Sequence, residues 1–398
     1  MSSLIERLRG VPWEALRVDL ALPAIERTLH GAAAEREVDR ALRSARDLDR
    51  GGRAALAEAI FGVALWRRRL AFHSGSSDPR LLLFALLRDL AGRDDAATLC
   101  AVTHPPPARE APEALADRFS LPDWLAALFV RELGETGAAA FAEAICAPGP
   151  VCLRANTLRC TREKLAAHLA AEGLATRPTR LAPDGLVVET PRPNLLGLES
   201  ARAGRFEAQD EGSQLLGALV QAQPGDTVLD LCAGAGGKSL QLAAQLQNRG
   251  TVIAHDLDGE RLQRLARRAA RAGATCVEIS APRAADRVLV DAPCSELGTL
   301  RRGPDARWRT SETSAAQLPA LQRELLERAA PLARKRLVYA TCTLRREENE
   351  AVALAFEHAH PEFLRRAPAL CATGDGFFRC LPHLHDTDAF FAAIWERR

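Results

Sequence analysis

Two cysteines of the 398-residue sequence stand where an apolar stretch gives way to a charged loop. Cys294 ends "RVLVDAPC" and precedes a loop with four arginines, and Cys342 ends "LVYATC" and precedes "TLRREENE". A thiolate is a strong nucleophile, so two thiols held close together could perform covalent catalysis. Cysteine is also a common buried core residue, which would explain either one alone. Their matching positions favour a shared site over two unrelated core residues.

The elements around these cysteines alternate between strands and helices. Buried-strand runs are "TVLDLC", "TVIAHD", "RVLVDAPC" and "RLVYATC", and helical stretches such as "SLQLAAQLQ" and "ERLQRLARRAARAG" lie between them. This alternation predicts an α/β fold with a Rossmann-like, doubly wound parallel sheet. In such sheets ligands bind beyond the carboxyl ends of the strands. Both cysteines end strands, so we expect them at one crevice.

A glycine-rich loop joins the first of these strands to a helix in "TVLDLCAGAGGKSLQLA". Glycine lets a ligand approach the backbone closely, and the helix start offers free N–H groups. Cys232 stands where a phosphate-binding P-loop needs its first glycine, and Ser239 where a dinucleotide fingerprint needs its third. The remaining interpretations are an S-adenosylmethionine (SAM) loop and a plain tight turn. The SAM loop would use the following residues: Cys232, Ala233, Gly234, Ala235, Gly236, Gly237 and Lys238.

The next strand, "TVIAHD", ends in Asp256 and leads into a helix. An acid at this position can accept hydrogen bonds from the ribose hydroxyls of a nucleoside cofactor, although acids also cap helices. We therefore expect SAM as the cofactor. With a methyl donor, two thiols suit methylation of cytosine C5, because thiolate addition at C6 turns the ring into an enamine that attacks the methyl group. Asp291 could bond N3 of the pyrimidine and stabilise charge there.

The whole chain divides by pattern into three parts. Residues 1–118 read as helices with apolar residues three and four apart, followed by a proline-rich linker. Residues 119–205 read as linker helices and a small α+β unit that begins with the strand "PVCLRANTL". Residues 206–398 hold the alternating strands and helices and form the expected catalytic domain.

The composition of the chain indicates its compartment and argues against membrane and metal binding. The chain is 47% hydrophobic and 26% charged with a net charge of +2, and no apolar run approaches the ~20 residues of a membrane span. The start, "MSSLIERLRG", lacks a signal-peptide pattern, and ten scattered cysteines without a CxxC pair read as reduced thiols. The histidine pairs lack the spacing of metal ligands. We expect a cytoplasmic monomer that binds neither membrane nor metal.

Five segments carry a family likeness. They are "FEAQDEGSQL", "DLCAGAGGK", "DAPCSELGTLRRGPDARW", "TCTLRREENE" and "PHLHDTDAFFAAIW". Together they resemble the RsmB-type members of the Nol/Nop/Sun group of RNA cytosine-C5 methyltransferases. The resemblance covers roughly residues 120–398, and its paired Pro-Cys and Thr-Cys motifs are specific. The N-terminal segment "DRGGRAALAEAIFGVALWRRRL" resembles more weakly the NusB-like RNA-binding domain of members that act on 16S rRNA.

The resemblance implies a function and roles for individual residues. It implies a SAM-dependent methyltransferase of ribosomal RNA, foremost 16S rRNA, with Cys342 as the nucleophile and Cys294 assisting product release. Asp291 would lie between cofactor and base, and Lys238 would supply a compact ammonium in a chain that otherwise favours arginine. RNA contacts are expected from the small α+β unit and the basic loop after Cys294, by the following residues: Arg154, Asn156, Arg301, Arg302 and Arg307.

The sequence also departs from the family pattern. Ala235 stands where the family usually has proline, and Glu296 adds a negative charge where it usually has a small residue. The connection in "CVEISAPRAADRVLVD" is short and leaves Ser280 or the backbone where an acid usually contacts the adenine. The alternative function is therefore a catalytically weakened or inactive member that acts as an RNA-binding or ribosome-assembly protein. A nucleotide hydrolase built on "GAGGKS" is disfavoured by Cys232.

Overall fold

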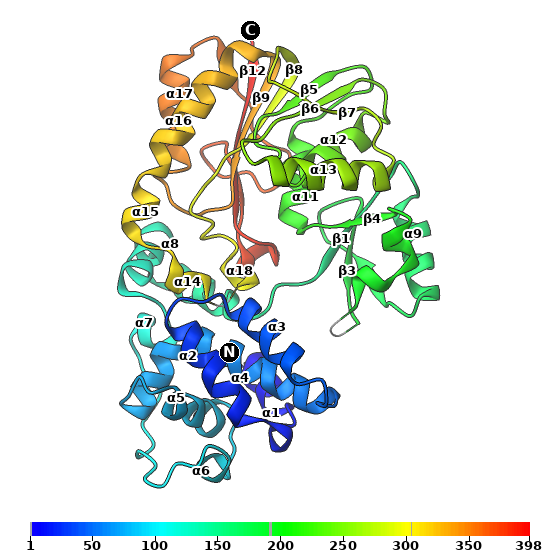
Figure 1. Ribbon diagram of the computed structural model, residues 1–398. Helices are drawn as coiled ribbons and strands as arrows, with labels where there is room; N and C mark the ends of the chain where they lie inside the picture. Colours follow the sequence, from blue (N-terminus) through cyan, green and yellow to red (C-terminus); the bar gives the residue numbers. More distant parts are fainter. Residues whose placement is uncertain (1, 191–192, 304) are drawn as a thin grey trace. The chain divides into compact units, whose positions relative to one another are not determined.

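The computed structural model describes residues 2–190, 193–303 and 305–398 (Figure 1). The chain divides into two compact units. The first unit comprises residues 1–148 and 300–314, and the second comprises residues 149–299 and 315–398. Each unit is described by itself below.

The first unit is helical. Its longer helices are α1 (Ser2–Arg9), α2 (Val18–Leu29), α3 (Ala34–Ser44), α4 (Arg50–Ser74), α5 (Pro79–Ala85) and α8 (Asp123–Ala144), with the short helices α6 (Ala96–Leu99), α7 (Leu115–Arg118) and α14 (Ala306–Arg309). Asp49 caps the start of α4 by accepting a hydrogen bond from the Gly52 amide, and Gly75 ends the helix in the left-handed conformation. The predicted all-helical N-terminal region is confirmed.

The chain between the proline-rich stretch and α8 is fixed to α4 by one arginine. Arg68 Nε lies 2.6 Å from Asp117 Oδ1, and Arg68 Nη1 lies 2.6 Å from Asp123 Oδ1. The Arg68 amide also donates to Ser120 Oγ at 3.0 Å. These contacts explain why α8 belongs to the helical unit, whereas the sequence suggested a boundary at residue 118.

The second unit begins with a small antiparallel sheet in the order β2-β3-β1-β4. Its elements are β1 (Cys152–Ala155), α9 (Arg162–Ala171), β2 (Thr176–Pro178), β3 (Gly185–Val188), α10 (Glu199–Arg202) and β4 (Phe206–Ala208). Leu165 and Leu169 of α9 pack with Leu153 and Leu186 of the sheet in one buried cluster. This is the α+β unit expected from the sequence.

The larger sheet has eight strands in the order β10-β12-β9-β8-β5-β6-β7, with β11 beside β12. The strands are β5 (Thr227–Asp230), β6 (Thr251–Ala254), β7 (Val277–Ile279), β8 (Ala285–Asp291), β9 (Ala333–Thr341), β10 (Phe363–Arg365), β11 (Phe378–Cys380) and β12 (Phe390–Arg397). The run from β7 to β9 is parallel, and β12 pairs antiparallel with β9. The predicted doubly wound sheet is confirmed, with an antiparallel edge added to it.

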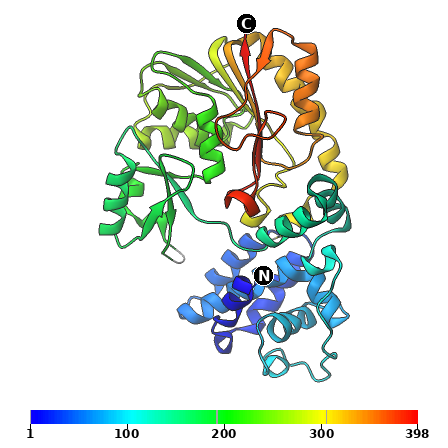
Figure 2. The same cartoon turned by 180° about the vertical axis from the view of Figure 1, so that it is seen from behind.

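Helices cover both faces of this sheet (Figures 1 and 2). On one side lie α16 (Leu318–Ala329) and α17 (Glu350–Ala359), and on the other lie α11 (Glu211–Leu219), α12 (Gly237–Gln245) and α13 (Gly259–Ala272). Successive strand residues point to opposite faces. Leu229 and Ile253 therefore join the core under α16, and Val228 and Val252 join the core under α12. The apolar layers on the two faces of the sheet thus hold the parallel strands so that their carboxyl ends lie along one edge.

Within the described residues, no helix is long and apolar enough to cross a membrane.

Candidate active site

A cavity of about 520 Å³ opens at the carboxyl ends of β5, β6, β8 and β9. It brings together the predicted catalytic residues and most of the predicted cofactor loop. Its lining includes Cys232, Ala233, Gly234, Ala235, Gly237, Lys238, Asp256, Asp291, Cys294 and Cys342. The expectation that both cysteines face one crevice therefore agrees with the geometry.

The glycine loop owes its path to two glycines with positive φ. Gly234 has φ of +54°, and no other atom lies within 4 Å of the place where a Cβ would stand. Gly236 has φ of +89° and is the N-cap residue before α12, and a Cβ there would meet Leu265 of α13 at 2.6 Å. Gly236 is thus required for packing against α13 and is not among the residues that line the cavity, so its predicted contact with the cofactor stays a prediction. Gly234 leaves the backbone open toward the cavity.

Asp256, two residues after β6, accepts hydrogen bonds from backbone amides on both carboxylate oxygens. The Gly234 amide donates to Asp256 Oδ2 at 2.8 Å, and the Asp258 amide donates to Oδ1 at 2.8 Å. This links the glycine loop to the tip of the next strand. The carboxylate is half-buried on the cavity wall, where it can accept hydrogen bonds from sugar hydroxyls.

Asp230, the last residue of β5, is a site residue that the sequence analysis did not select. It is 1% exposed, and its Oδ2 accepts a hydrogen bond from Ser239 Oγ at 2.6 Å. Its Oδ1 is buried and has no hydrogen-bond partner in the protein, and Asp230 is one of the residues that line the cavity. Burial raises the pKa of Asp230 to about 7, against the Ser239 hydrogen bond, and the charge of Asp291 adds to the increase. The cavity therefore contains a carboxyl group that titrates near neutral pH.

Lys238 and Asp291 form an ion pair across the cavity floor. Lys238 Nζ lies 2.6 Å from Asp291 Oδ2. Burial lowers the pKa of Lys238, but the charge and hydrogen bond of Asp291 outweigh it, with help from Asp230 and Cys342, so the pKa is raised. The ammonium is charged at neutral pH. It orients the Asp291 carboxylate, and its attraction to Cys342 would stabilise a thiolate there.

The two cysteines are in contact. Cys294 Sγ lies 3.3 Å from Cys342 Sγ, and the Cys342 amide points to Cys294 Sγ at 3.3 Å. The hydrogen bond with Cys294 raises the pKa of Cys342 well above its ordinary value, and burial and the charges of Cys294, Asp291 and Glu296 add to this. Cys342 is thus a neutral thiol in the unliganded protein. Deprotonation must accompany substrate binding if it acts as a nucleophile.

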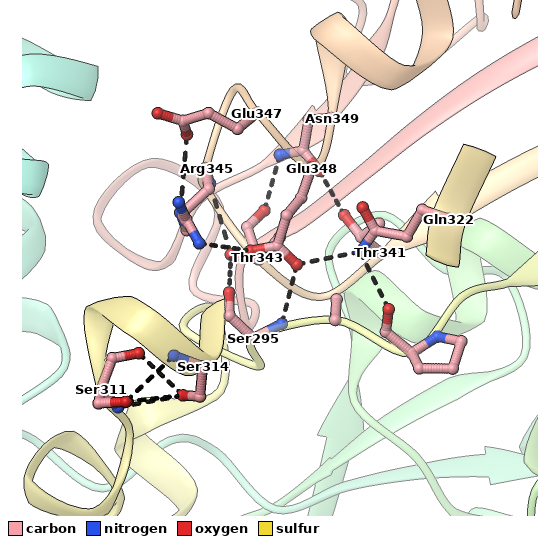
Figure 3. Close-up of polar contacts among 12 residues, drawn as sticks. Ser295, Ser311, Ser314, Gln322, Thr341, Thr343, Arg345, Glu347, Glu348 and Asn349 are labelled. Carbon is pink, nitrogen blue, oxygen red and sulfur yellow. Dashed lines mark hydrogen bonds and ion pairs between the residues drawn. The ribbon is translucent and has the colours of Figure 1, made fainter. Parts of the chain in front are cut away.

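A buried glutamate fixes the loop that carries Cys294 (Figure 3). Glu348 is fully buried, and its Oε2 accepts hydrogen bonds from the Ser295 amide at 2.9 Å and from Gln322 Nε2 at 3.0 Å. Gln322, on α16, also donates to the Pro293 carbonyl at 2.9 Å. The backbone on both sides of Cys294 is therefore held by side chains of other elements.

The loop that carries Cys342 is joined to the same network (Figure 3). Ser295 Oγ lies 2.8 Å from Thr343 Oγ1, which connects the two cysteine loops directly. Asn349 accepts from Thr341 Oγ1 at 2.5 Å and donates to the Thr343 carbonyl at 3.0 Å. Such locked side chains keep a pair of thiols at a defined separation.

Cys232 is a third thiol of the cavity. Burial, together with the smaller effect of the charges of Asp230, Asp291 and Asp256, raises its pKa to about 12. A thiol with this pKa stays protonated at neutral pH. Cys232 therefore resembles Cys342 in being protonated at rest, and what distinguishes Cys342 is its contact with Cys294 Sγ.

Two of the predicted RNA-binding residues have structural roles. Arg154 is 3% exposed, and it donates to Gln209 Oε1 at 2.6 Å and to the Gly237 carbonyl at 3.4 Å. Asn156 is 4% exposed, and its Nδ2 donates to the carbonyls of Gly204 and Ala272, each at 2.8 Å. Arg154 thus connects the small sheet to α12 and Asn156 connects it to α13, and their burial disfavours the predicted contact with RNA.

The basic loop after Cys294 also differs from the prediction. Arg307 is fully buried in the helical unit, where it donates to the carbonyls of Phe119 at 3.1 Å and Ile145 at 3.2 Å. Arg301 is 9% exposed, whereas Arg302 is exposed. A buried guanidinium that uses its N–H groups on backbone carbonyls is unavailable to phosphate. Of the three arginines, only Arg302 keeps the surface position that the prediction needs.

The cavity also has a wall that sequence reasoning left unassigned. Gln209, Asp210 and Ser213 line it, and they come from the start of α11 and the residues before it. The segment "FEAQDEGSQL" had contributed to the family likeness without a role for single residues.

No group of three or more potential metal ligands occurs within the described residues.

Comparisons with known proteins agree with this geometry. The model of the 16S rRNA methyltransferase RsmB/F family matches residues 218–396, and the model of its ferredoxin-like domain matches residues 121–194. Probable ribosomal RNA small subunit methyltransferase B of Synechocystis sp. is 35% identical over 305 residues, which make up 70% of this chain and 67% of that protein. The corresponding Bacillus subtilis protein is 34% identical over 309 residues, 71% of this chain and 68% of that protein.

Solved structures show the same fold. The crystal structure of PH0851 aligns with a TM-score of 0.80 at 24% identity and covers 98% of this chain and 99% of that one. NSun6 from Pyrococcus horikoshii, solved with the SAM analogue SFG, aligns with a TM-score of 0.63 at 21% identity, over 69% of this chain and 98% of that one. The site and fold define a SAM-dependent methyltransferase. The chain belongs to the 16S rRNA methyltransferase RsmB/F family, whose members are ribosomal RNA methyltransferases.

Proposed function

We propose that this protein methylates C5 of a cytosine in ribosomal RNA, foremost 16S rRNA, through a covalent bond between Cys342 and C6 of the base. The observation that carries this proposal is the 3.3 Å contact between Cys294 Sγ and Cys342 Sγ beside Asp291. One thiol is enough for a nucleophile. A second thiol in contact with it suits a reaction that must afterwards break the first carbon–sulfur bond.

The cavity residues fit SAM. The open backbone at Gly234 and Gly237 allows close approach, since no atom lies within 4 Å of an added Cβ at either position. Asp256 can bond the ribose hydroxyls, and Asp230 Oδ1 is a buried acceptor without a protein partner. SAM, when bound, supplies an electrophilic methyl group to the attacking carbon.

The chain's own groups perform the remaining chemistry. As Cys342 Sγ bonds to C6, its thiol proton passes to the Asp291 carboxylate in the same cavity, and electron density moves to C5. Asp291, oriented by Lys238, takes up this proton and donates it to N3 of the ring, which neutralises the negative charge that the addition places there. After methylation, the C5 proton passes to a base, the ring double bond re-forms, and the C6–sulfur bond breaks. Cys294 Sγ lies 3.3 Å from Cys342 Sγ, so it can give its own proton to the departing sulfur and take up the C5 proton, which leaves both cysteines as thiols.

Mapping the product of 16S rRNA methylation tests the proposal. Wild-type protein with SAM should produce 5-methylcytosine, detected by mass spectrometry of RNA fragments. Cys342→Ala should abolish the product while RNA binding survives. Cys276→Ala is a matched control, because Cys276 is a half-buried thiol outside the cavity and should leave the yield unchanged. Methylation at another atom, or full activity of Cys342→Ala, would refute the proposal.

The alternative of a catalytically weakened RNA-binding protein rests on one feature of the sheet. Residues 280–284 connect β7 to β8 without a helix, and they do not contribute to the lining of the described cavity. Ser280 Oγ accepts a hydrogen bond from Arg283 at 2.9 Å. This connection offers less to an adenine than a longer one would. Calorimetric titration with SAM separates the two functions, since the weakened protein would bind RNA but release no heat with SAM.

A further inference from the structure

A groove of about 650 Å³ lies between α13 and the small sheet of the second unit. One wall is a row of arginines spaced three and four residues apart along α13, so they share a face of the helix. They are Arg264, Arg267, Arg268 and Arg271. The opposite wall is apolar and includes Leu195, Leu196 and Phe206.

The arginines of this groove fall into two pairs. Arg268 and Arg271 both bind the buried carboxylate of Glu207, with Arg268 Nη2 at 2.8 Å and Arg271 Nη2 at 2.7 Å. Arg264 and Arg267 are exposed, and neither has a hydrogen-bond or ion-pair partner within the described residues. One carboxylate thus faces four guanidinium groups, which leaves the groove strongly positive.

The two walls of the groove are fixed to each other. The last carbonyl of α13, at Ala272, accepts hydrogen bonds from Asn156 Nδ2 at 2.8 Å and from Arg159 Nε at 3.2 Å. Gly204 packs so closely on α13 that a Cβ would stand 2.2 Å from the Arg271 carbonyl. The arginine row is therefore presented by a rigid scaffold and needs little reorganisation to bind a ligand.

We propose that this groove, which we call the α13 groove, binds the phosphate backbone of the RNA beside the target base. This proposal rests on the proposed function, because it assigns part of the binding surface for the same substrate. The α13 groove is continuous with the active-site cavity, since Ala208, Ala235 and Arg268 line both. A polyanion that follows the arginine row from Arg271 and Arg267 to Arg268 arrives at the glycine loop.

The composition of the groove favours RNA over an acidic protein. Guanidinium groups bind phosphate oxygens with paired N–H donors. Leu196, which is 83% exposed, offers an apolar surface to a ribose or a base. Two phosphate contacts on a single strand contribute about 1.4 to the slope of log Kd against log salt. Extrapolated from about 1 M salt, where such contacts no longer contribute, this makes binding at about 0.1 M salt about 25-fold tighter than without the two contacts.

The test is RNA binding by the full-length chain with Arg264→Gln and Arg267→Gln combined, measured on in vitro transcribed 16S rRNA from about 50 to 200 mM salt. We expect a Kd about 25-fold weaker near 0.1 M salt and a slope lower by about 1.4. Arg264→Lys with Arg267→Lys retains the charges and should retain most of the binding and the slope. Arg323→Gln with Arg334→Gln removes two other exposed arginines of the same unit and should change neither.

The outcomes separate this proposal from the function on which it rests. Unchanged affinity and slope in the Gln variant would overturn the α13 groove as an RNA site, and so would an equal loss in the Arg323 and Arg334 control. Failure of the wild-type protein to methylate 16S rRNA would instead count against the proposed function. Weaker rRNA binding together with unaltered SAM binding and melting temperature supports the groove.

Discussion

The substitution Asp230→Asn tests the electrostatics of the cavity directly. It keeps the shape of the side chain and an acceptor for Ser239 Oγ, but it removes the ionisation. In the wild type, burial raises the Asp230 pKa from 3.8 to about 7. Between pH 3.8 and about pH 7, Asp230 of the folded protein therefore holds a proton that the unfolded chain has released. Stability must fall as pH rises through this range, because the unfolded state binds fewer protons.

The size of the effect follows from linkage. With an unfolded pKa of 3.8 and a folded pKa of about 7, the free energy of unfolding should fall by about 3 kcal/mol between pH 5 and 8 through this group alone. Almost all of the change lies below pH 7. In Asp230→Asn this contribution is absent, so the variant should gain about 3 kcal/mol relative to wild type over the same range.

Urea unfolding at a series of pH values measures this difference. Asp286→Asn is the matched control, because a hydrogen bond from the Thr227 amide and the nearby Lys335 lower the pKa of Asp286. Asp286 is therefore ionised in both states above about pH 5, and its loss should lower stability without a pH-dependent difference in this range. A constant difference between Asp230→Asn and wild type from pH 5 to 8 would show that Asp230 is ionised throughout, and the reasoning would fail.

Three further substitutions test separate parts of the site. Glu296→Gly should stabilise the protein by about 1 kcal/mol in urea unfolding, because Glu296 has φ of +56°. It should also speed alkylation of Cys342 by iodoacetamide, since the Glu296 charge adds to the hydrogen bond with Cys294 and to burial in raising the Cys342 pKa. Thr343→Val removes the contact with Ser295 Oγ and should cost about 1 kcal/mol while lowering kcat more than it raises KM for RNA. Asn156→Ala removes the donor to the Gly204 carbonyl and one of the two donors to the Ala272 carbonyl, and it should cost about 2 kcal/mol in urea unfolding, with unchanged thermal protection by SAM.

The parts of the fold that sequence could predict are those with a strong local pattern. Apolar runs that end in a cysteine or an acid marked β5, β6, β8 and β9, and their common orientation in a parallel sheet brought Cys294 and Cys342 together. The antiparallel edge was harder to predict. Strand β12 pairs with β9 across a long stretch of chain, and no local signal specifies that register.

Side-chain roles were less accessible than positions. In a chain rich in arginine, sequence alone does not separate Arg307, which is buried against backbone carbonyls, from Arg264, which is exposed in a groove. Asp230 was missed because an acid at the end of a buried strand gives no sign of its unpaired oxygen. Glu348 was missed because its charge suggested a solvated loop, whereas the fold buries it completely.

The most direct test of the central claim is covalent trapping of RNA by the variant Cys294→Ala. If Cys342 adds to C6 and Cys294 assists its release, the variant incubated with SAM and 16S rRNA should accumulate a protein–RNA adduct. The adduct should migrate as a slow, nuclease-sensitive band on a denaturing gel, and it should be absent when Cys342→Ala is added to the same chain. An equal band in the single and double variants would identify a different nucleophile, and no band in either would contradict the role of Cys294 in release.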